Sequence, residues 1–239
     1  MLHEQKNRTE LTYRLLLSFV GLLIVVFLVA FPPTVTSVFL WRKPIIGTSF
    51  AILCVLGVLA VIFPRKCSGL LEPKKRNNVT SSANYRSHES SIGFEGHHPT
   101  CGKYSAHVFQ LLGKTKCAAC VGLLFGALLA LTGSFFYFFV GLIVSDYSFI
   151  LVILGAVGTL IGLFQFAFRG LFRLLANSVF VVSALLVLVS VDATVGGLFF
   201  DLFVVCLIVF WLFTRISLSK WDHRRICSVC DAENCSARP

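Results

Sequence analysis

Four histidine and cysteine residues have the types and the spacing of a metal site. His98, Cys101, Cys117 and Cys120 follow the pattern H-x2-C-x15-C-x2-C. Zinc takes four such ligands in a tetrahedron, and they commonly arrive as two close pairs separated by a loop. The spacing therefore predicts a small zinc-binding knuckle with a structural rather than a catalytic role. The alternative is a set of solvated histidines and interfacial cysteines that hold no metal.

Further histidines and cysteines leave the ligand set open. His97 and His107 compete with His98 for the place of the fourth ligand. The C-terminal region offers a second group of possible zinc ligands with a tighter spacing. The alternative is that this region is a polar tail that binds no metal. This group consists of His223, Cys227, Cys230 and Cys235.

The pair Cys117-x-x-Cys120 also suggests a second chemistry. It stands at the start of a long apolar segment, and the N-terminus of a helix favours the thiolate form of a cysteine. A dithiol in that place could pass electrons to a quinone that reaches it from the lipid. A membrane thiol oxidoreductase is therefore an alternative hypothesis.

The residues around these motifs indicate a membrane protein. Of the 239 residues 56% are hydrophobic and 13% are charged, whereas about a quarter of a soluble domain is charged. Several apolar runs reach the roughly 17–25 residues that a helix needs to cross a bilayer. We expect an all-α integral membrane protein with about six transmembrane helices and the small cytosolic knuckle. The predicted spans are residues 15–31, 45–63, 120–144, 149–168, 174–191 and 196–214.

Changes in composition divide the chain into five regions. The Ser-rich segment after the second span has little that could form a core, so we interpret it as a disordered linker. The regions are an N-terminal two-helix hairpin (1–63), a basic linker (64–96), the knuckle (97–120), a four-helix membrane region (120–214) and a basic, cysteine-containing tail (215–239).

The basic residues predict the orientation of these spans. All 21 Lys and Arg residues except Arg42 and Lys43 fall in the loops and tails of one side. The positive-inside rule places that side in the cytosol, so both termini and both cysteine groups are expected there, in a protein of the cell membrane. The cytosol is reducing and favours metal thiolates over disulfides. We expect anionic lipid headgroups as partners and no nucleic acid. The residues expected to anchor the tail at the inner leaflet are Arg215, Lys220, Arg224 and Arg225, together with Trp211 and Trp221.

Two glycine pairs predict close helix packing. Gly122 and Gly126 lie in the third span, and Gly158 and Gly162 in the fourth. Small residues four apart let helix backbones approach closely in lipid. Because a short loop joins these two spans, we expect them to pack against one another. A homo-oligomer contact through one of the glycine faces is the alternative.

Three polar residues lie within the predicted spans. Asp201 is near the outer end of its span, so we interpret it as a solvated interfacial aspartate. Its alternative is a shallow cation or proton site, since charged groups in a bilayer are often functional. Gln165 and Asn177 lie near the inner ends of neighbouring spans and are expected to hydrogen-bond across helices.

The residues of the knuckle also resemble a known pattern. His97-His98-Pro99-x-Cys101, followed by Cys117-Ala118-x-Cys120-x-Gly122-x3-Gly126, is similar to the HHPxC…CAxCxGxxxG pattern of an uncharacterised, largely archaeal family of predicted integral membrane proteins. The resemblance covers residues 97–126. It implies that the motif acts as a unit at the start of a transmembrane helix, and it implies no activity.

Three functions remain in competition. The first is a non-enzymatic membrane protein, acting as a scaffold, a sensor or a gated bundle, in which zinc fixes the end of the linker to the start of the third span. The second is the thiol oxidoreductase, and the third is a small-solute or ion transporter that uses Asp201. We favour the first, because the predicted cytosolic face argues against an oxidative-folding role and none of Asp201, Gln165 and Asn177 lies at mid-membrane. The sequence also carries no phosphate-binding glycine loop, nucleophile elbow or H-E-x-x-H helix.

Overall fold

The computed structural model describes most of the chain. Its backbone is described for residues 2–35, 39–62, 94–95, 98–99, 107–111 and 114–228, and its side chains for residues 8–35, 39–62, 107–110 and 116–228.

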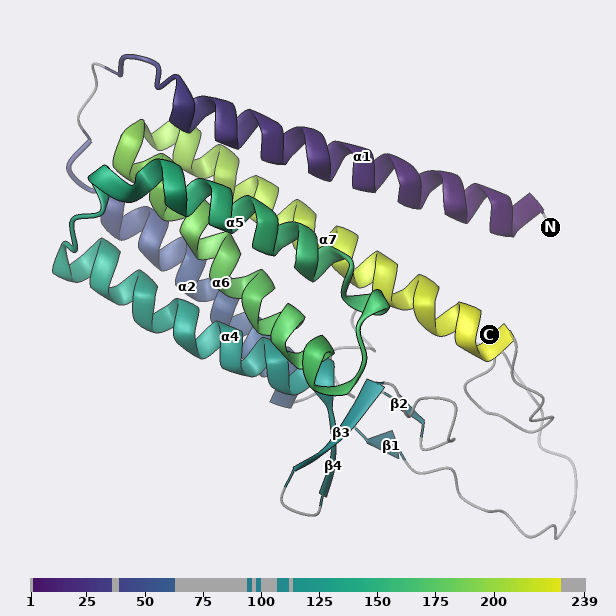
Figure 1. Cartoon of the computed structure of the whole chain (residues 1–239). Coiled ribbons are helices and arrows are strands. Elements are labelled where there is room, and N and C mark those ends of the chain that lie inside the picture. The colour runs from purple at the N-terminus through teal and green to yellow at the C-terminus, as the bar shows by residue number, and fades with distance from the viewer. Residues whose placement is uncertain are drawn as a thin grey trace, which may run out of the picture.

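Six long helices make up almost all of the described structure (Figure 1). They are α1 (Leu2–Ala30), α2 (Arg42–Ile62), α4 (Ala118–Phe135), α5 (Ser148–Leu163), α6 (Gly170–Thr194) and α7 (Leu198–Ser228). Each of them is long and apolar enough to cross a membrane. Their outer surfaces carry large exposed apolar side chains, among them Leu16, Phe125 and Phe149, which suit a lipid environment. The prediction of an all-α protein with six helices of membrane-spanning length is confirmed.

Short elements connect the helices. Phe136–Val140 (η2) is a π-helical turn that prolongs α4 and ends at Gly141, whose φ of 89° suits glycine. Two 3-10 turns, η3 (Ser145–Tyr147) and η4 (Gln165–Ala167), flank α5. Two antiparallel strand pairs precede α4. They are β1 (Phe94–Glu95) with β2 (His98–Pro99), and β3 (Val108–Leu111) with β4 (Lys114–Cys117).

The strands lie at one end of the bundle, which we call the strand end (Figure 1). The N-terminal end of α1 and the C-terminal end of α7 lie at the same end. This arrangement places both ends of the described chain and strand β4, which ends at Cys117, on one side of the bundle.

Helix α6 forms the centre of the bundle. In its apolar membrane-length stretch 67% of the residues are buried, against 22–39% in the corresponding stretches of the other five helices. It packs on α4, α5 and α7. The small polar residues Ser178 and Ser183 on its surface allow the neighbouring helices to come close.

Both glycine pairs pack on α6 rather than on each other. Cβ atoms at Gly122 and Gly126 would collide with the α6 backbone around Leu174 and Ser178. Cβ atoms at Gly158 and Gly162 would collide with the α6 side chains Ser183 and Phe180. The predicted role of these glycines in helix packing is therefore confirmed, but the expectation that the third and fourth spans pack together is wrong. The close approach is to α6, whose backbone faces the first glycine pair and whose side chains face the second.

Helix α7 continues well beyond the predicted sixth span. It runs through Thr214 to Ser228, so residues 215–228 are helical and not a separate tail. Its buried residues recur at alternating intervals of three and four along the whole helix, which is the period of one helix face. They include Asp201, Val204, Ile208, Trp211, Arg215, Leu218 and Asp222.

Candidate functional site

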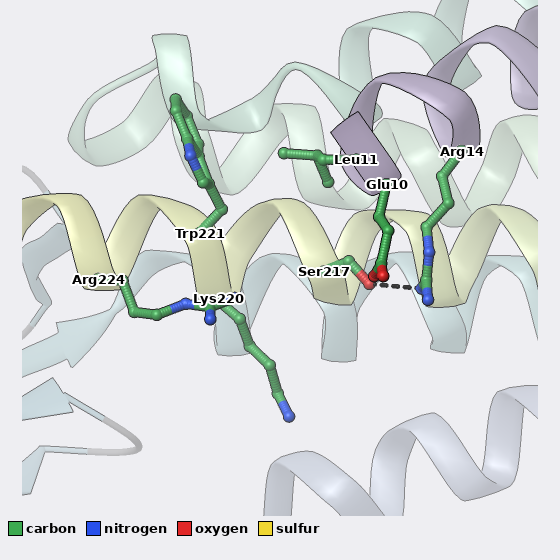
Figure 2. Close-up of a pocket in the computed structure, with 7 residues that line it drawn as sticks. All are labelled: Glu10, Leu11, Arg14, Ser217, Lys220, Trp221 and Arg224. Atoms are coloured by element: carbon green, nitrogen blue, oxygen red, sulfur yellow. Dashed lines mark hydrogen bonds between the residues drawn. The ribbon is translucent and has the colours of Figure 1, made fainter. Parts of the chain in front are cut away.

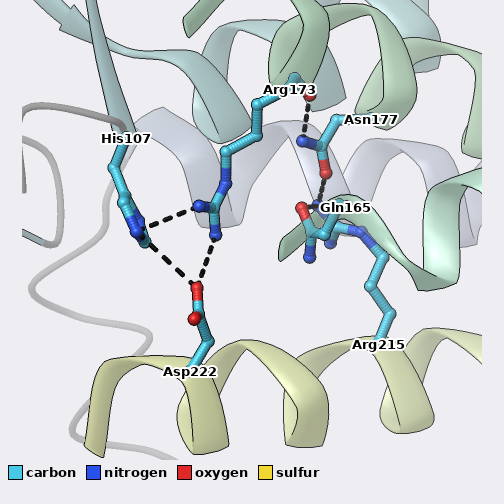
Figure 3. A network of polar contacts seen from close by, with 6 residues as sticks. All are labelled: His107, Gln165, Arg173, Asn177, Arg215 and Asp222. Carbon is cyan, nitrogen blue, oxygen red and sulfur yellow. Dashed lines mark hydrogen bonds and ion pairs between the residues drawn. The ribbon is translucent and has the colours of Figure 1, made fainter. Parts of the chain in front are cut away.

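A buried polar network joins the strand end to the two last helices (Figure 3). One half of it is a contact between three side chains, His107 beside β3, Arg173 on α6 and Asp222 on α7. The Arg173 guanidinium donates to His107 Nε2 at 3.0 Å and to Asp222 Oδ2 at 3.3 Å. The side chains of His107 and Arg173 are 4% and 2% exposed. The segment that precedes α4 is therefore anchored between α6 and α7.

The geometry assigns the tautomer of His107. A guanidinium has donors only, so His107 Nε2 must accept the hydrogen bond from Arg173 and carries no proton. His107 is then neutral with its proton on Nδ1, although its Nε2 lies 3.6 Å from Asp222 Oδ2. Because Nε2 accepts from Arg173 and Nδ1 carries the proton, neutral His107 in this geometry offers no lone pair to a metal ion.

The other half of the network surrounds Arg215 (Figure 3). This guanidinium on α7 donates to Gln165 Oε1 at 3.1 Å and to Asn177 Oδ1. Asn177 in turn donates through Nδ2 to the backbone carbonyl of Arg173 at 2.5 Å, which links the two halves. The hydrogen bonds across helices that were expected of Gln165 and Asn177 are present, and Arg215 is their common donor.

Two residues expected at the lipid surface are in fact inside the bundle. Arg215 is 4% exposed and Trp211 is fully buried, so the prediction that they anchor a tail at the inner leaflet is wrong. Both lie on the buried face of α7, and the Arg215 guanidinium donates to Asn177 on α6. Trp221 is only partly buried and packs its ring edge-on against Phe166 at 5.9 Å between centroids.

The predicted cysteine pair lies next to Arg215. Cys117 ends β4 and is buried, and Cys120 follows in the first turn of α4. The two thiols are within hydrogen-bonding contact, and both interact electrostatically with the Arg215 guanidinium. The structure therefore places the pair at a helix start and within reach of a buried cation.

The charges of this network do not balance among the described side chains. Arg173 and Arg215 are both buried cations, and Asp222 is the one carboxylate that contacts either of them in the described part of the chain. A buried charge without a partner is costly. A thiolate at Cys117 or Cys120 would supply the missing negative charge.

The remaining predicted zinc ligands are only partly within the described residues. His97, Cys101, Cys230 and Cys235 lie outside them, and the side chain of His98 is likewise outside. Among the residues that are described, no group of three or more His, Cys, Asp or Glu side chains could hold a metal ion. Cys117 and Cys120 can supply half of a tetrahedral site, so the zinc knuckle stays a prediction.

Two residues of the predicted second site lie on α7. His223 and Cys227 are four residues apart and so belong to the same helix face. The His223 ring lies 5.7 Å from the His107 ring, between centroids. The second group of possible ligands therefore adjoins the first at the strand end.

Asp201 belongs to a second buried cluster at the opposite end of the bundle. Arg42 at the start of α2 lies 3.1 Å from carboxylate oxygens of both Asp192 and Asp201. The Tyr137 hydroxyl donates to Asp192 Oδ2 at 2.7 Å, and the Lys43 ammonium lies 4.8 Å from the centre of the Tyr137 ring. Asp201 is fully buried, so its interpretation as a solvated aspartate is wrong. Its position near the end of the span was predicted well, but the side chain faces Arg42 inside the bundle.

Comparisons with known proteins add no relative. No family model matches this sequence, and no curated protein and no solved structure matches it. The resemblance of residues 97–126 to the archaeal membrane-protein pattern accordingly rests on the sequence alone.

Proposed function

We propose that this chain is a non-enzymatic, multi-pass protein of the cell membrane that acts as a metal-responsive scaffold. In this proposal both termini and the strand end face the cytosol, as the distribution of basic residues favours. A zinc ion is held by His98, Cys101, Cys117 and Cys120. Its binding fixes the segment before α4 against the inner ends of α6 and α7.

The observation that carries the proposal is the excess of buried positive charge beside the cysteine pair. Arg215 is buried and its hydrogen-bond partners, Gln165 and Asn177, are neutral. Two neutral thiols would leave this cation without a counter-charge, whereas zinc-bound thiolates remain negatively charged ligands next to it. Hydrogen bonds and charges around the residues that coordinate a metal commonly orient those residues and change the affinity for the metal.

The docking of His107 explains how metal could affect the helices. His107 lies in the same segment as the cysteine pair and contacts α6 through Arg173 and α7 through Asp222. A metal that orders this segment would stabilise these contacts, and its loss would release them. Because metal binding and folding of a small site are coupled, the arrangement of α4, α6 and α7 becomes dependent on metal.

The test is the alkylation of individual thiols in the full-length chain, purified in detergent without chelator. A maleimide reagent is applied with and without a zinc chelator, and modification at each cysteine is read by peptide mass spectrometry. We expect the chelator to accelerate modification of Cys117 and Cys120, because metal-bound thiolates react slowly. Cys206, which is exposed on the outer surface of α7, serves as the internal control and should not change. Equal modification of the pair with and without chelator would exclude the bound metal.

A thiol oxidoreductase is the second candidate, favoured by the contact between the two thiols. Formation of a Cys117–Cys120 disulfide releases two electrons and two protons, and a quinone from the lipid would take up both and become a quinol. The same alkylation experiment separates the candidates. A pair that reacts at once without chelator, and becomes unreactive when a quinone is added, would support the oxidoreductase.

A further inference from the structure

A cavity between α1 and α7 carries an excess of positive charge (Figure 2). Its volume is about 170 Å³, enough for a phosphate group and accompanying water. One carboxylate, that of Glu10, and three basic side chains line it. The lining residues are Glu10, Leu11 and Arg14 of α1, and Ser217, Lys220, Trp221 and Arg224 of α7.

The basic groups of this cavity are available to an anion. Within the described part of the chain, no carboxylate forms an ion pair with Arg14, Lys220 or Arg224. Ser217 holds the Arg14 guanidinium at the cavity wall by accepting a hydrogen bond of 2.8 Å, and its own hydroxyl donates to the Phe213 carbonyl. The guanidinium keeps four further N–H donors.

The cavity lies at the level where the apolar parts of both helices end. On α1 the apolar run begins directly after Arg14, and on α7 it ends just before Arg215. Side chains next to the cavity on α1 are exposed and suited to lipid, with Tyr13 at 63% and Leu17 at 57%. Tyrosine and tryptophan are typical of the interface between the hydrocarbon and the headgroups, and Trp221 lines the cavity itself. A ligand in the cavity can therefore keep a hydrocarbon tail beside α1.

We propose that this cavity binds the phosphate of an anionic phospholipid from the leaflet at the strand end. Arg14, Lys220 and Arg224 bind the phosphate oxygens, and Trp221 packs against the glycerol region. The apolar surface of α1 next to Tyr13 takes the acyl chains. The proposal is independent of the zinc site, because none of the cavity residues belongs to the predicted metal ligands.

Native mass spectrometry of the detergent-purified full chain tests the proposal. Phosphatidylglycerol and phosphatidylcholine are offered in competition, and the Lys220→Gln/Arg224→Gln variant is compared with an Arg169→Gln/Lys116→Gln control. The control removes the same charge from exposed residues of the strand end that do not line the cavity. A basic residue near a membrane surface contributes about fivefold to the binding of an anionic lipid, so the first variant should bind phosphatidylglycerol about 30-fold more weakly.

The expected result is one retained phosphatidylglycerol per chain, selected over phosphatidylcholine, with the loss confined to the cavity variant. Equal loss in the two variants would show diffuse attraction to the whole basic surface and would overturn the proposal, as would equal retention of the two lipids.

A further arm adds inorganic phosphate at millimolar concentration. Displacement of the lipid by phosphate would assign the cavity to a soluble anion instead. A single Arg14→Gln variant should weaken phosphatidylglycerol binding about fivefold. An unchanged unfolding temperature of this variant would show that the weaker binding does not come from misfolding.

Discussion

Replacing Asp222 by alanine should release the segment before α4 from the helix bundle. Asp222 accepts a hydrogen bond from Arg173 and lies 3.6 Å from His107. Without it, the buried Arg173 guanidinium loses its one described carboxylate partner. Alanine is a strong helix former, so α7 itself should persist. Any loss of stability is therefore expected to come from the contact.

The size of the effect follows from the burial of the pair. Removing one partner of a fully buried ion pair costs about 3–5 kcal/mol. The Asp222 side chain is 11% exposed, so water can partly replace it, and we expect about 2–3 kcal/mol. For a chain of this size that corresponds to a fall in unfolding temperature of roughly 4–12 °C. Asp222→Asn keeps an oxygen that can accept from Arg173 and should lie between alanine and the wild type.

Two measurements on the full chain in detergent check this prediction. The first is the unfolding temperature, and the second is backbone hydrogen exchange, in which residues 107–117 should lose protection while α5 does not. Asp146→Ala is the matched control, since Asp146 is exposed at the opposite end and its loss should cost less than about 0.5 kcal/mol. The reasoning is refuted if Asp222→Ala behaves like Asp146→Ala in both measurements.

Three further predictions concern packing, the second buried cluster and orientation. Gly158→Ala should destabilise the chain by about 1–3 kcal/mol because its Cβ meets α6, whereas Gly57→Ala, with open space around it, should be neutral or slightly stabilising in the same unfolding assay. Asp201→Asn removes one of the two carboxylates that share a guanidinium, so we expect a destabilisation of about 1–2 kcal/mol. A loss of ion or solute flux at unchanged expression would in addition support transport. In intact cells a membrane-impermeant maleimide should label Ser145→Cys but not Ser228→Cys, and the opposite labelling would invert the proposed orientation.

The number and the positions of the long helices were predictable because membrane-spanning length is a local property of the sequence. An apolar run of about twenty residues indicates a helix wherever its neighbours lie. The end of the last helix was missed because residues after Thr214 are polar, and polarity alone suggests a tail. The alternating spacing of three and four that joins Trp211, Arg215 and Asp222 is a signal that could have revealed the continuing buried face.

The partners of buried charges could not be predicted in the same way. Arg42 and Asp201 are 159 residues apart, and no local pattern connects them. Likewise, a window of hydropathy shows that Asp201 lies near the end of a span but not whether its side chain faces lipid, water or another helix. The contact of Arg173 with His107 and Asp222 depends on the central position of α6, which follows from the packing of the whole bundle. The cysteine pair, in contrast, was found from its spacing alone. The spacing did not reveal that the Arg215 guanidinium lies close enough to interact electrostatically with both thiols.

The most direct test of the central claim is the zinc content per chain in detergent-purified protein, prepared without chelator. Wild type, Cys117→Ser/Cys120→Ser and the control Cys206→Ser are measured side by side by atomic emission. We predict one or two equivalents of zinc in the wild type and in the control, and one equivalent fewer in the double variant. A metal-free wild type that carries a reversible Cys117–Cys120 disulfide would contradict the zinc knuckle and favour the oxidoreductase.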